Sequence, residues 1–385
     1  MPDGRCAVKL QPGLYLDLAE DIYFAQDALG SSDLKNLLRA PCDWWYGSRH
    51  NPHRTESERG KHLILGRALH ALMLEGTQAY EARFSVEPDP NDYPGALKTA
   101  DDIKDLLRKC ESPFKSKDSK GALIKIARDN NLAGRIWDEI KAQHTQEVEL
   151  FGKSPISAAQ DRALRDMSKL VEGQPSIAKG LQAGIPEASV FWENPERPGV
   201  MMRARLDSLS PNMTLDLKTL SNWKGRTVSD MPRRQIEEFE YDIQRRYYDE
   251  AREMARQFIN EDKVFLPENG FMDGAVDGYY QGLSFLDEDI CTKLQAVAAQ
   301  DNWLWVWLFY QMRDDHNHKA PIVIPRFHQP EGEVWDQAGR KVEQALANYD
   351  EWVGRFGLET PWHHIEEALE LEDKDLAGLQ YKNII

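Results

Sequence analysis

The chain has 385 residues, of which 41% are hydrophobic and 10% aromatic, so it can build a folded core and is not a disordered chain. Its 48 basic and 64 acidic side chains give a formal net charge of −16, which argues against a protein that coats nucleic acid by general phosphate neutralisation. A basic groove inside an acidic surface would still suit an enzyme that acts on a polyanion. The longest strongly apolar run, 303–310, is far shorter than the ~20 residues that span a bilayer, and the first ten residues show no apolar signal core. We expect a soluble cytoplasmic protein with no membrane partner.

Four cysteines are spread along the chain without any CxxC spacing: Cys6, Cys42, Cys110 and Cys291. Structural zinc sites and cysteine-ligated clusters need closely spaced ligands. We therefore expect reduced thiols and no such site.

Two helices are predicted near the start of the chain. Ser31 and Ser32 precede leucines at helical spacing, which predicts a capped helix that ends at Pro41. Apolar residues at helical spacing predict a second helix over 63–74. On that helix Gly66 lies one turn before His70, so space is left beside the imidazole. This arrangement suits a metal ligand, although a core histidine is the alternative.

The segment 87–153 is strongly charged and begins with three prolines within seven residues. The stretches 98–109 and 121–131 predict short amphipathic helices. We interpret 87–153 as a charged helical insertion within one domain that covers 1–385. A further amphipathic helix is predicted over 158–172.

The region that follows predicts a sheet covered by helices. Alternating apolar residues and turn residues predict three consecutive antiparallel strands within 187–220. A run that is apolar on both faces, 303–310, predicts a strand in the middle of a sheet. The remaining predicted elements are a long helix over 233–258, a neighbouring strand over 322–327 and a closing helix over 333–353. The fold class is therefore α/β, with a mixed sheet flanked by helices.

The hairpin made by the second and third of these strands carries two carboxylates. Its turn is centred between Pro211 and Asn212, so opposed residues have numbers that sum to 423, as those of Asp207 and Asp216 do. Like charges placed opposite each other repel, and a Mg²⁺ ion bound by both would neutralise them. Lys218, one pleat further along, could then act on a water or a phosphate. The alternative is an exposed hairpin in which Asp207 pairs with Arg205 and Asp216 with Lys218.

On the long helix, Tyr241, Gln244 and Tyr248 share a face beside the apolar stripe. Such a face could hydrogen-bond a phosphate or a base edge. It could equally form a polar seam against a neighbouring helix.

Taken in order, five strings resemble the PD-(D/E)XK nuclease superfamily and, more closely, RecE-type phage exonucleases. They are SSDLKNLLRAPCDWWY, GRALHALMLEG, PEASVFWENPERPGVMMRARLD, LDLKT and YDIQRRYYDEA. The resemblance implies a PD-(D/E)XK core that uses Mg²⁺, with Mn²⁺ able to substitute. It implies that His70, Asp207, Asp216 and the Leu217 carbonyl bind the metal, that Lys218 is the catalytic lysine, and that Gln244 and Tyr248 lie near the DNA. Glu187 matches an acidic position before the hairpin and is expected to support catalysis.

The same resemblance implies an exodeoxyribonuclease that degrades double-stranded DNA from its ends, 5′ to 3′, for phage-type recombination in a bacterial host. Its implied partners are a single-strand annealing protein of the RecT type and further copies of the chain in a closed ring, a tetramer by resemblance. The acidic net charge of the whole chain does not extend to the predicted site, because 203–256 holds 11 basic and 10 acidic residues. DNA binding at this region is therefore compatible with the charge. DNA contacts are expected from Arg205, Trp223, Lys224 and Arg226, although a solvated polar loop before a helix is the alternative for the last three.

Three other functions stay open on the sequence. The chain could be an endonuclease or repair nuclease of the same superfamily, or a glycoside hydrolase that uses Asp207 and Asp216 as acid and base. A glycosidase gives Lys218 and His70 no task and would stay active in EDTA. A silent DNA-binding assembly factor is the third alternative, and retention of all the chemical residues argues against it. No GxxxxGK[ST] string is present, so the chain is not itself a P-loop motor.

Overall fold

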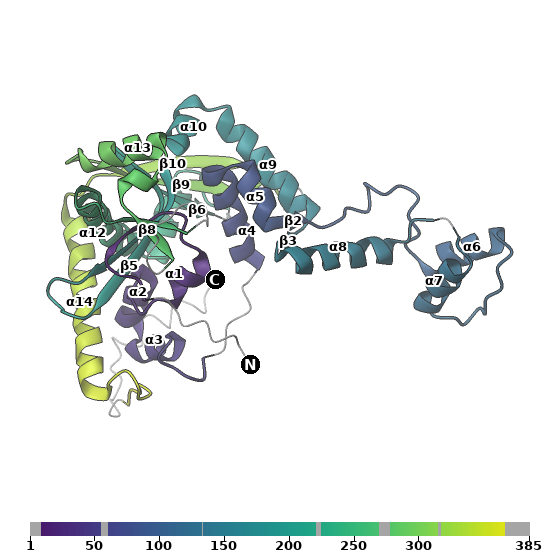
Figure 1. Ribbon diagram of the computed structural model, residues 1–385, viewed down its shortest axis with the longest axis horizontal. Coiled ribbons are helices and arrows are strands. Elements are labelled where there is room, and N and C mark those ends of the chain that lie inside the picture. The colour runs from purple at the N-terminus through teal and green to yellow at the C-terminus, as the bar shows by residue number, and fades with distance from the viewer. Residues whose placement is uncertain are drawn as a thin grey trace, which may run out of the picture.

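One mixed sheet organises the body of the protein in the computed structural model, which describes residues 9–54, 61–132, 134–220, 225–268, 278–314 and 317–365 (Figure 1). Within these residues its strand order is β10-β9-β6-β5-β4-β1-β7-β8. The strands are β1 (Gly13–Tyr15), β4 (Ile185–Glu193), β5 (Met201–Ser210), β6 (Met213–Thr219), β7 (Val264–Pro267), β8 (Tyr279–Gln281), β9 (Leu304–Gln311) and β10 (Ile322–His328).

The middle of the sheet confirms the predicted strands. β4, β5 and β6 form consecutive antiparallel pairs, β6 runs parallel to β9, and β9 is antiparallel to β10. β9 lies between two strands and is buried along most of its length, as expected of a run that is apolar on both faces. The short strands β1, β7 and β8, which extend the other side of the sheet, were not predicted, because three or four residues give little alternation to detect.

Helices cover both faces, which confirms the α/β class. Leucines of α2 (Ser31–Arg39) and apolar residues of α12 (Tyr241–Asn260), α13 (Glu288–Ala298) and α14 (Glu333–Phe356) share a buried cluster with β4 and β5. Residues of α4 (Lys61–His70), α9 (Ala158–Glu172) and α10 (Pro175–Gln182) pack with β6 and β9 in a second cluster. Within the described residues no helix has both the length and the apolar character needed to cross a bilayer.

The predicted single helix over 233–258 is wrong. Two helices replace it, α11 (Asp230–Glu238) and α12, and they are separated at Glu240, whose φ of 51° lies in the left-handed region. An ordinary side chain adopts this conformation only at some cost, so hydrophobic spacing alone did not reveal the break. As a result Tyr241 occupies the first turn of a new helix.

Two details near the start of the chain also differ from prediction. α2 is capped by Gly30, whose N–H donates to the Asp33 carboxylate at 2.7 Å, rather than by a serine. Pro41 does not only end that helix but also begins α3 (Pro41–Gly47), in keeping with the preference of proline for a first turn. The predicted helix over 63–74 is present as α4, which passes into a π-helical turn, Ala71–Glu75. A further helix, α5 (Thr77–Arg83), follows and was not predicted.

The charged segment 87–153 projects from the body as an arm (Figure 1). A parallel pair of short strands, β2 (Phe84–Val86) and β3 (Ser154–Ile156), forms its root. The two predicted helices are present as α6 (Ala100–Lys109) and α7 (Lys120–Asp129) at the far end, and α8 (Trp137–Phe151) leads back to the root. α8 was not predicted, because it has no buried residue and so lacks a clear apolar stripe.

A buried arginine ties α12 to the β5–β6 turn. The side chain of Arg252 is fully buried and donates to the carbonyls of Ser210 (2.8 Å), Pro211 (2.7 Å) and Met213 (2.9 Å). Its guanidinium also lies over the ring of Trp303, 4.7 Å from the centroid. The hairpin that carries Asp207 and Asp216 is thereby fixed to the long helix that carries Gln244.

Arg252→Met should lower the free energy of unfolding by about 2–4 kcal/mol, because it leaves several buried carbonyls without a donor. Arg256→Met is the matched control one turn further along α12. Arg256 pairs with Glu253 and Asp301 near the surface, so its loss should cost less than about 1 kcal/mol. Urea unfolding of the two variants measures the difference, and equal losses would contradict the role given to Arg252.

Candidate metal centre and active site

Three neighbouring strands bring three carboxylates into register. The predicted pairing of the hairpin is confirmed for Ser208–Leu215, Leu209–Thr214 and Ser210–Met213. On the other side of β5, the pairs Pro186–Ser208 and Ala188–Leu206 flank the positions of Glu187 and Asp207. Asp207 itself is left out of the strand pairing: the β4–β5 pairing skips it and resumes at Ala188–Leu206, and the β5–β6 pairing ends at Ser208–Leu215.

The interruption has two local causes. Glu187 has a φ of 49°, in the left-handed region, which breaks the extended geometry of β4 at that residue. On β6, the Leu217 N–H donates to Asp207 Oδ2 at 2.7 Å instead of to the backbone of β5. The Asp207 carboxylate thus replaces the backbone of β5 as the hydrogen-bond partner of Leu217, the residue that follows Asp216.

His70 completes a cluster with two of these carboxylates. Its Nδ1 lies 3.3 Å from Glu187 Oε1 and its Nε2 3.7 Å from Asp207 Oδ2. Ligand atoms of the three residues all lie within 4.8 Å of one another. His70 is the last residue of α4, directly before the π-helical turn, and turns of this kind are frequent at functional sites. A Cβ at Gly66 would meet no atom within 4 Å, so the predicted space one turn before His70 is present.

The charges of this cluster are strongly coupled. Burial alone would lower the pKa of His70, but the carboxylates of Asp207 and Glu187 raise it to about 9. Burial raises the pKa of Asp207 to about 7, against the opposing effect of His70. Burial would also raise the pKa of Glu187, yet its hydrogen bond to His70 lowers it. An imidazolium between two carboxylates marks a place where positive charge is stabilised.

Asp216 forms the second half of the site. Its carboxylate is 1% exposed and accepts hydrogen bonds at Oδ1 from Lys218 Nζ (2.8 Å) and Gln244 Nε2 (3.1 Å). Asp216 Oδ2 is buried without a hydrogen bond, although Lys218 Nζ lies 2.8 Å away. Burial would lower the pKa of Lys218, but the carboxylates of Asp216 and Asp207 raise it, so the side chain is an ammonium.

These residues fit a divalent cation. Mg²⁺ takes carboxylate oxygens and keeps positions for water or phosphate, and Mn²⁺ also accepts an imidazole nitrogen. His70, Glu187 and Asp207 supply one nitrogen and two carboxylates, and the buried Asp216 Oδ2 lacks a hydrogen-bonding partner. The prediction placed Glu187 in a supporting role, whereas the structure groups it with His70 and Asp207. Metal binding by His70, Asp207, Asp216 and the Leu217 carbonyl stays a prediction.

The other predicted residues are placed as follows. Tyr248 lies on the Gln244 face of α12, with its ring 6.0 Å from that of Trp305, and burial raises its pKa, so it is a neutral phenol. Arg205 donates to Ser189 Oγ and to the Leu18 carbonyl, so its guanidinium already has protein partners. Arg226 lies in the loop after β6 and is partly exposed. Trp223 and Lys224 lie outside the described residues. The expected DNA contacts of all these residues stay predictions.

Lys35 was missed by the sequence analysis. Its ammonium donates to the Phe239 carbonyl at 2.7 Å and lies 5.3 Å from the centre of the Tyr241 ring, while Lys218 Nζ lies 4.8 Å from the same ring. Burial and the nearby Lys218 ammonium lower the pKa of Lys35 to about 8. Two lysines therefore lie at the Tyr241 ring, and one of them, Lys218, pairs with the Asp216 carboxylate. Only the packing of α2 against α12 brings Lys35 there, and no local spacing could indicate it.

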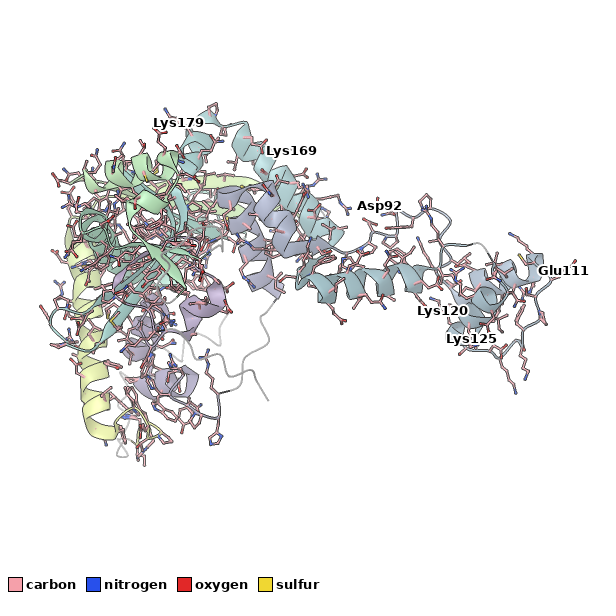
Figure 2. The ribbon with its side chains drawn as sticks, viewed as in Figure 1. Asp92, Glu111, Lys120, Lys125, Lys169 and Lys179 are labelled. Atoms are coloured by element: carbon pink, nitrogen blue, oxygen red, sulfur yellow. The ribbon has the colours of Figure 1, made fainter. Side chains whose placement is uncertain are left out.

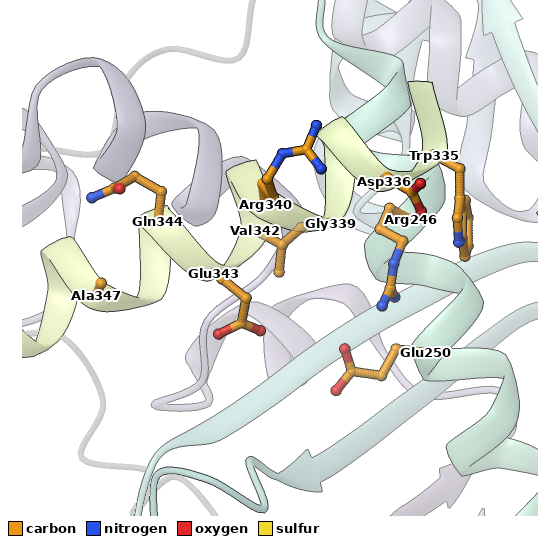
Figure 3. Close-up of a pocket in the computed structure, with 10 residues that line it drawn as sticks. All are labelled: Arg246, Glu250, Trp335, Asp336, Gly339, Arg340, Val342, Glu343, Gln344 and Ala347. Atoms are coloured by element: carbon orange, nitrogen blue, oxygen red, sulfur yellow. The ribbon is translucent and has the colours of Figure 1, made fainter. Parts of the chain in front are cut away.

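A surface groove between α12 and α14 is separate from this cluster (Figure 3). Arg246, Glu250 and Glu343 lie along it, and the ring of Trp335 lies 4.8 Å from the Arg246 guanidinium. None of the predicted site residues lines the groove, and its charges are of mixed sign. It therefore adds nothing to the candidate metal centre.

Comparison with protein families gives a match that covers more than half of the chain. The family model described as "PDDEXK-like domain of unknown function (DUF3799)" matches residues 30–266. The matched residues include the whole cluster, from His70 to Tyr248. A search of curated proteins gives no match to this chain.

Asp207→Asn and Glu187→Gln should each weaken the binding of Mn²⁺ to the DNA-free protein by more than about 10-fold, since even the loss of a supporting group costs a metal site that much. Glu196→Gln is the control, because it changes an exposed carboxylate in the β4–β5 turn. Isothermal titration calorimetry compares the three variants. If Asp207→Asn and Glu187→Gln bind Mn²⁺ as tightly as the Glu196→Gln control, the metal binds elsewhere.

Proposed function

Because the chain belongs to the PDDEXK-like family DUF3799, within the PD-(D/E)XK nuclease superfamily, we propose that it is a metal-dependent exodeoxyribonuclease that degrades linear double-stranded DNA from its ends. The observation that supports this most is the cluster of His70, Glu187 and Asp207 beside the buried Asp216–Lys218 pair. Nuclease chemistry uses every member of this set. A glycoside hydrolase would leave His70 and Lys218 without a role.

A bound Mg²⁺ or Mn²⁺ would supply Lewis-acid activation of a water and neutralise charge on the phosphate. His70, Glu187 and Asp207 would hold it. Lys218 extends from the end of β6 beside Asp216, where its ammonium can orient the attacking water and stabilise the negative charge that develops on the phosphate. Gln244 fixes the Asp216 carboxylate by its hydrogen bond, and the Tyr241 ring lies against the Lys218 ammonium.

The finer assignment follows the resemblance to RecE-type exonucleases. Under this proposal the enzyme digests 5′ to 3′ and leaves single strands for phage-type recombination, with an annealing protein of the RecT type as partner. A closed ring of identical subunits, a tetramer by resemblance, would enclose the product strand. The net charge of −16 supports such a design, because an acidic protein repels DNA except where basic side chains gather.

Linear duplex DNA should be degraded in Mg²⁺ while closed circular duplex of the same sequence is left intact. EDTA should stop digestion, because no group in the site can replace the Lewis acid. Gel analysis of both substrates over time measures this. Cleavage of the circle would exclude the exonuclease and favour the endonuclease alternative, and activity in EDTA would exclude a metal-dependent nuclease altogether.

Lys218→Ala should lower the rate of cleavage by about 10²–10⁴-fold, because the lysine acts on the water or the transition state. Binding of Mn²⁺ and of duplex DNA should change by less than about twofold. Lys179→Ala removes an exposed lysine of α10 and serves as the control with normal turnover. Near-normal turnover of Lys218→Ala would show that the Asp216–Lys218 pair is not the catalytic one.

A further inference from the structure

The end of the arm is a separate small structure, which we call the arm tip and define as residues 97–136. Its buried residues form a cluster of their own, made only by arm residues: Ile103, Leu107, Leu123, Ala127 and Ile136. Backbone pairing between Leu97 and Ile136 closes it. The arm tip therefore contributes nothing to the core around the catalytic cluster, and its own fold presents a surface far from the body (Figure 1).

The arm tip reverses the charge of the rest of the chain. It holds 10 Lys/Arg and 6 Asp/Glu, a net charge of +4, whereas the whole chain carries −16. Most of the acidic side chains already have partners within the tip. Asp101, Asp105 and Asp129 pair with Lys104, Arg108 and Lys125, and Asp102 and Asp118 accept backbone N–H groups.

Part of the surplus positive charge lies between the last residue of α6 and the first residue of α7, where 109–120 holds four lysines against Glu111 and Asp118. Lys109, Lys115 and Lys117 are exposed and form no ion pair with any described residue. Lys120 and Lys125 follow on α7, on the same outlying part of the molecule (Figure 2). Exposed lysines on flexible stems suit phosphates held as point charges.

The character of the exposed surface favours a polyanion over a protein partner. No described residue of the arm tip is an exposed large hydrophobic, whereas Leu150 and Phe151, at the root end of α8, are exposed at 77% and 66%. Stable protein interfaces need a buried apolar centre, and backbone contacts to nucleic acid need mainly positive charge. An apolar contact between subunits would thus fit the root of the arm, and not its tip.

We propose that the arm tip is a second DNA-binding site, which contacts the phosphate backbone of a duplex away from the point of cleavage. This inference rests on the proposed function for the identity of the polyanion. The tip lies beyond the outer end of α8, which alone extends about 22 Å at 1.5 Å per residue, so the DNA that it contacts lies away from the point of cleavage. Contacts of this kind carry no sequence information and lengthen the stay of the enzyme on its substrate.

The test uses Lys115→Gln/Lys117→Gln in the full chain, with Lys218→Ala in every protein so that the DNA stays intact. Fluorescence anisotropy measures the affinity for an end-labelled duplex of about 40 base pairs from 50 to 200 mM salt. At low salt the double variant should bind about 5–20-fold more weakly. The slope of log K against log salt should fall in magnitude by about 1–2, because each lost phosphate contact contributes about 0.9.

Lys169→Gln/Lys179→Gln is the matched control, since it removes two exposed lysines without ion pairs from α9 and α10 on the body (Figure 2). Its affinity should change less than about twofold. Equal losses in both double variants, or an unchanged salt slope, would overturn the proposal. A fall in subunit number by light scattering with DNA affinity unchanged would instead assign the tip to contacts between copies.

Measuring cleavage and DNA binding separately distinguishes a failure of this inference from a failure of the proposed function. If the wild-type chain cuts linear DNA while the tip variant binds normally, only the second site is wrong. If the wild-type chain cuts no DNA, the proposed function fails, and anisotropy still reports whether the tip binds duplex. Lys115→Glu/Lys117→Glu should enlarge the effect of the glutamine variant, and circular dichroism should show an unchanged fold because both lysines are exposed.

Discussion

Negative charge concentrated at the centre of a sheet is the constraint on which this structure depends. Glu187, Asp207 and Asp216 come from three adjacent strands, and in a low-dielectric interior their mutual repulsion is large. Each carboxylate therefore has a specific partner that offsets it. His70 serves Glu187 and Asp207, the Leu217 N–H serves Asp207, and Lys218 serves Asp216. His70 comes from the last residue of α4, and the other two partners come from β6.

Three departures from regular helix or strand geometry lie around the carboxylate cluster. β4 is broken by a left-handed residue at Glu187, α4 passes into a π-helical turn after His70, and a left-handed residue at Glu240 separates α11 from α12. Each departure costs free energy of order 1 kcal/mol or more in isolation. Together they place an imidazole, a carboxylate and the first turn of α12 around the end of the β5–β6 hairpin. Regular helices and strands with the same hydrophobic pattern would not bring these side chains together.

The sequence predicted the parts of the fold that repeat with a regular period. The register of the hairpin followed from the turn at Pro211–Asn212, and a run of residues that is apolar on both faces identified β9. The departures from regularity were not predictable in this way, because a left-handed glutamate or a π-helical turn leaves no periodic signal. Glu240 shows this most clearly, since hydrophobic spacing continued straight through the break. Lys35 could not be predicted for a different reason. Its position beside Tyr241 depends on a contact between helices about 200 residues apart in the chain.

The parallel pairing of β2 and β3 at the root of the arm limits how this protein can vary. Antiparallel strands can be joined by a two-residue turn, whereas parallel strands need a crossover of a dozen or more residues, because the chain must return to the end at which it started. The segment between Val86 and Ser154 can therefore be shortened or replaced in a relative, but it cannot shrink to a tight turn while this pair persists. Some excursion from the body is a topological requirement of the root. The length of the segment between β2 and β3 and the number of its lysines are the features that remain free to diverge.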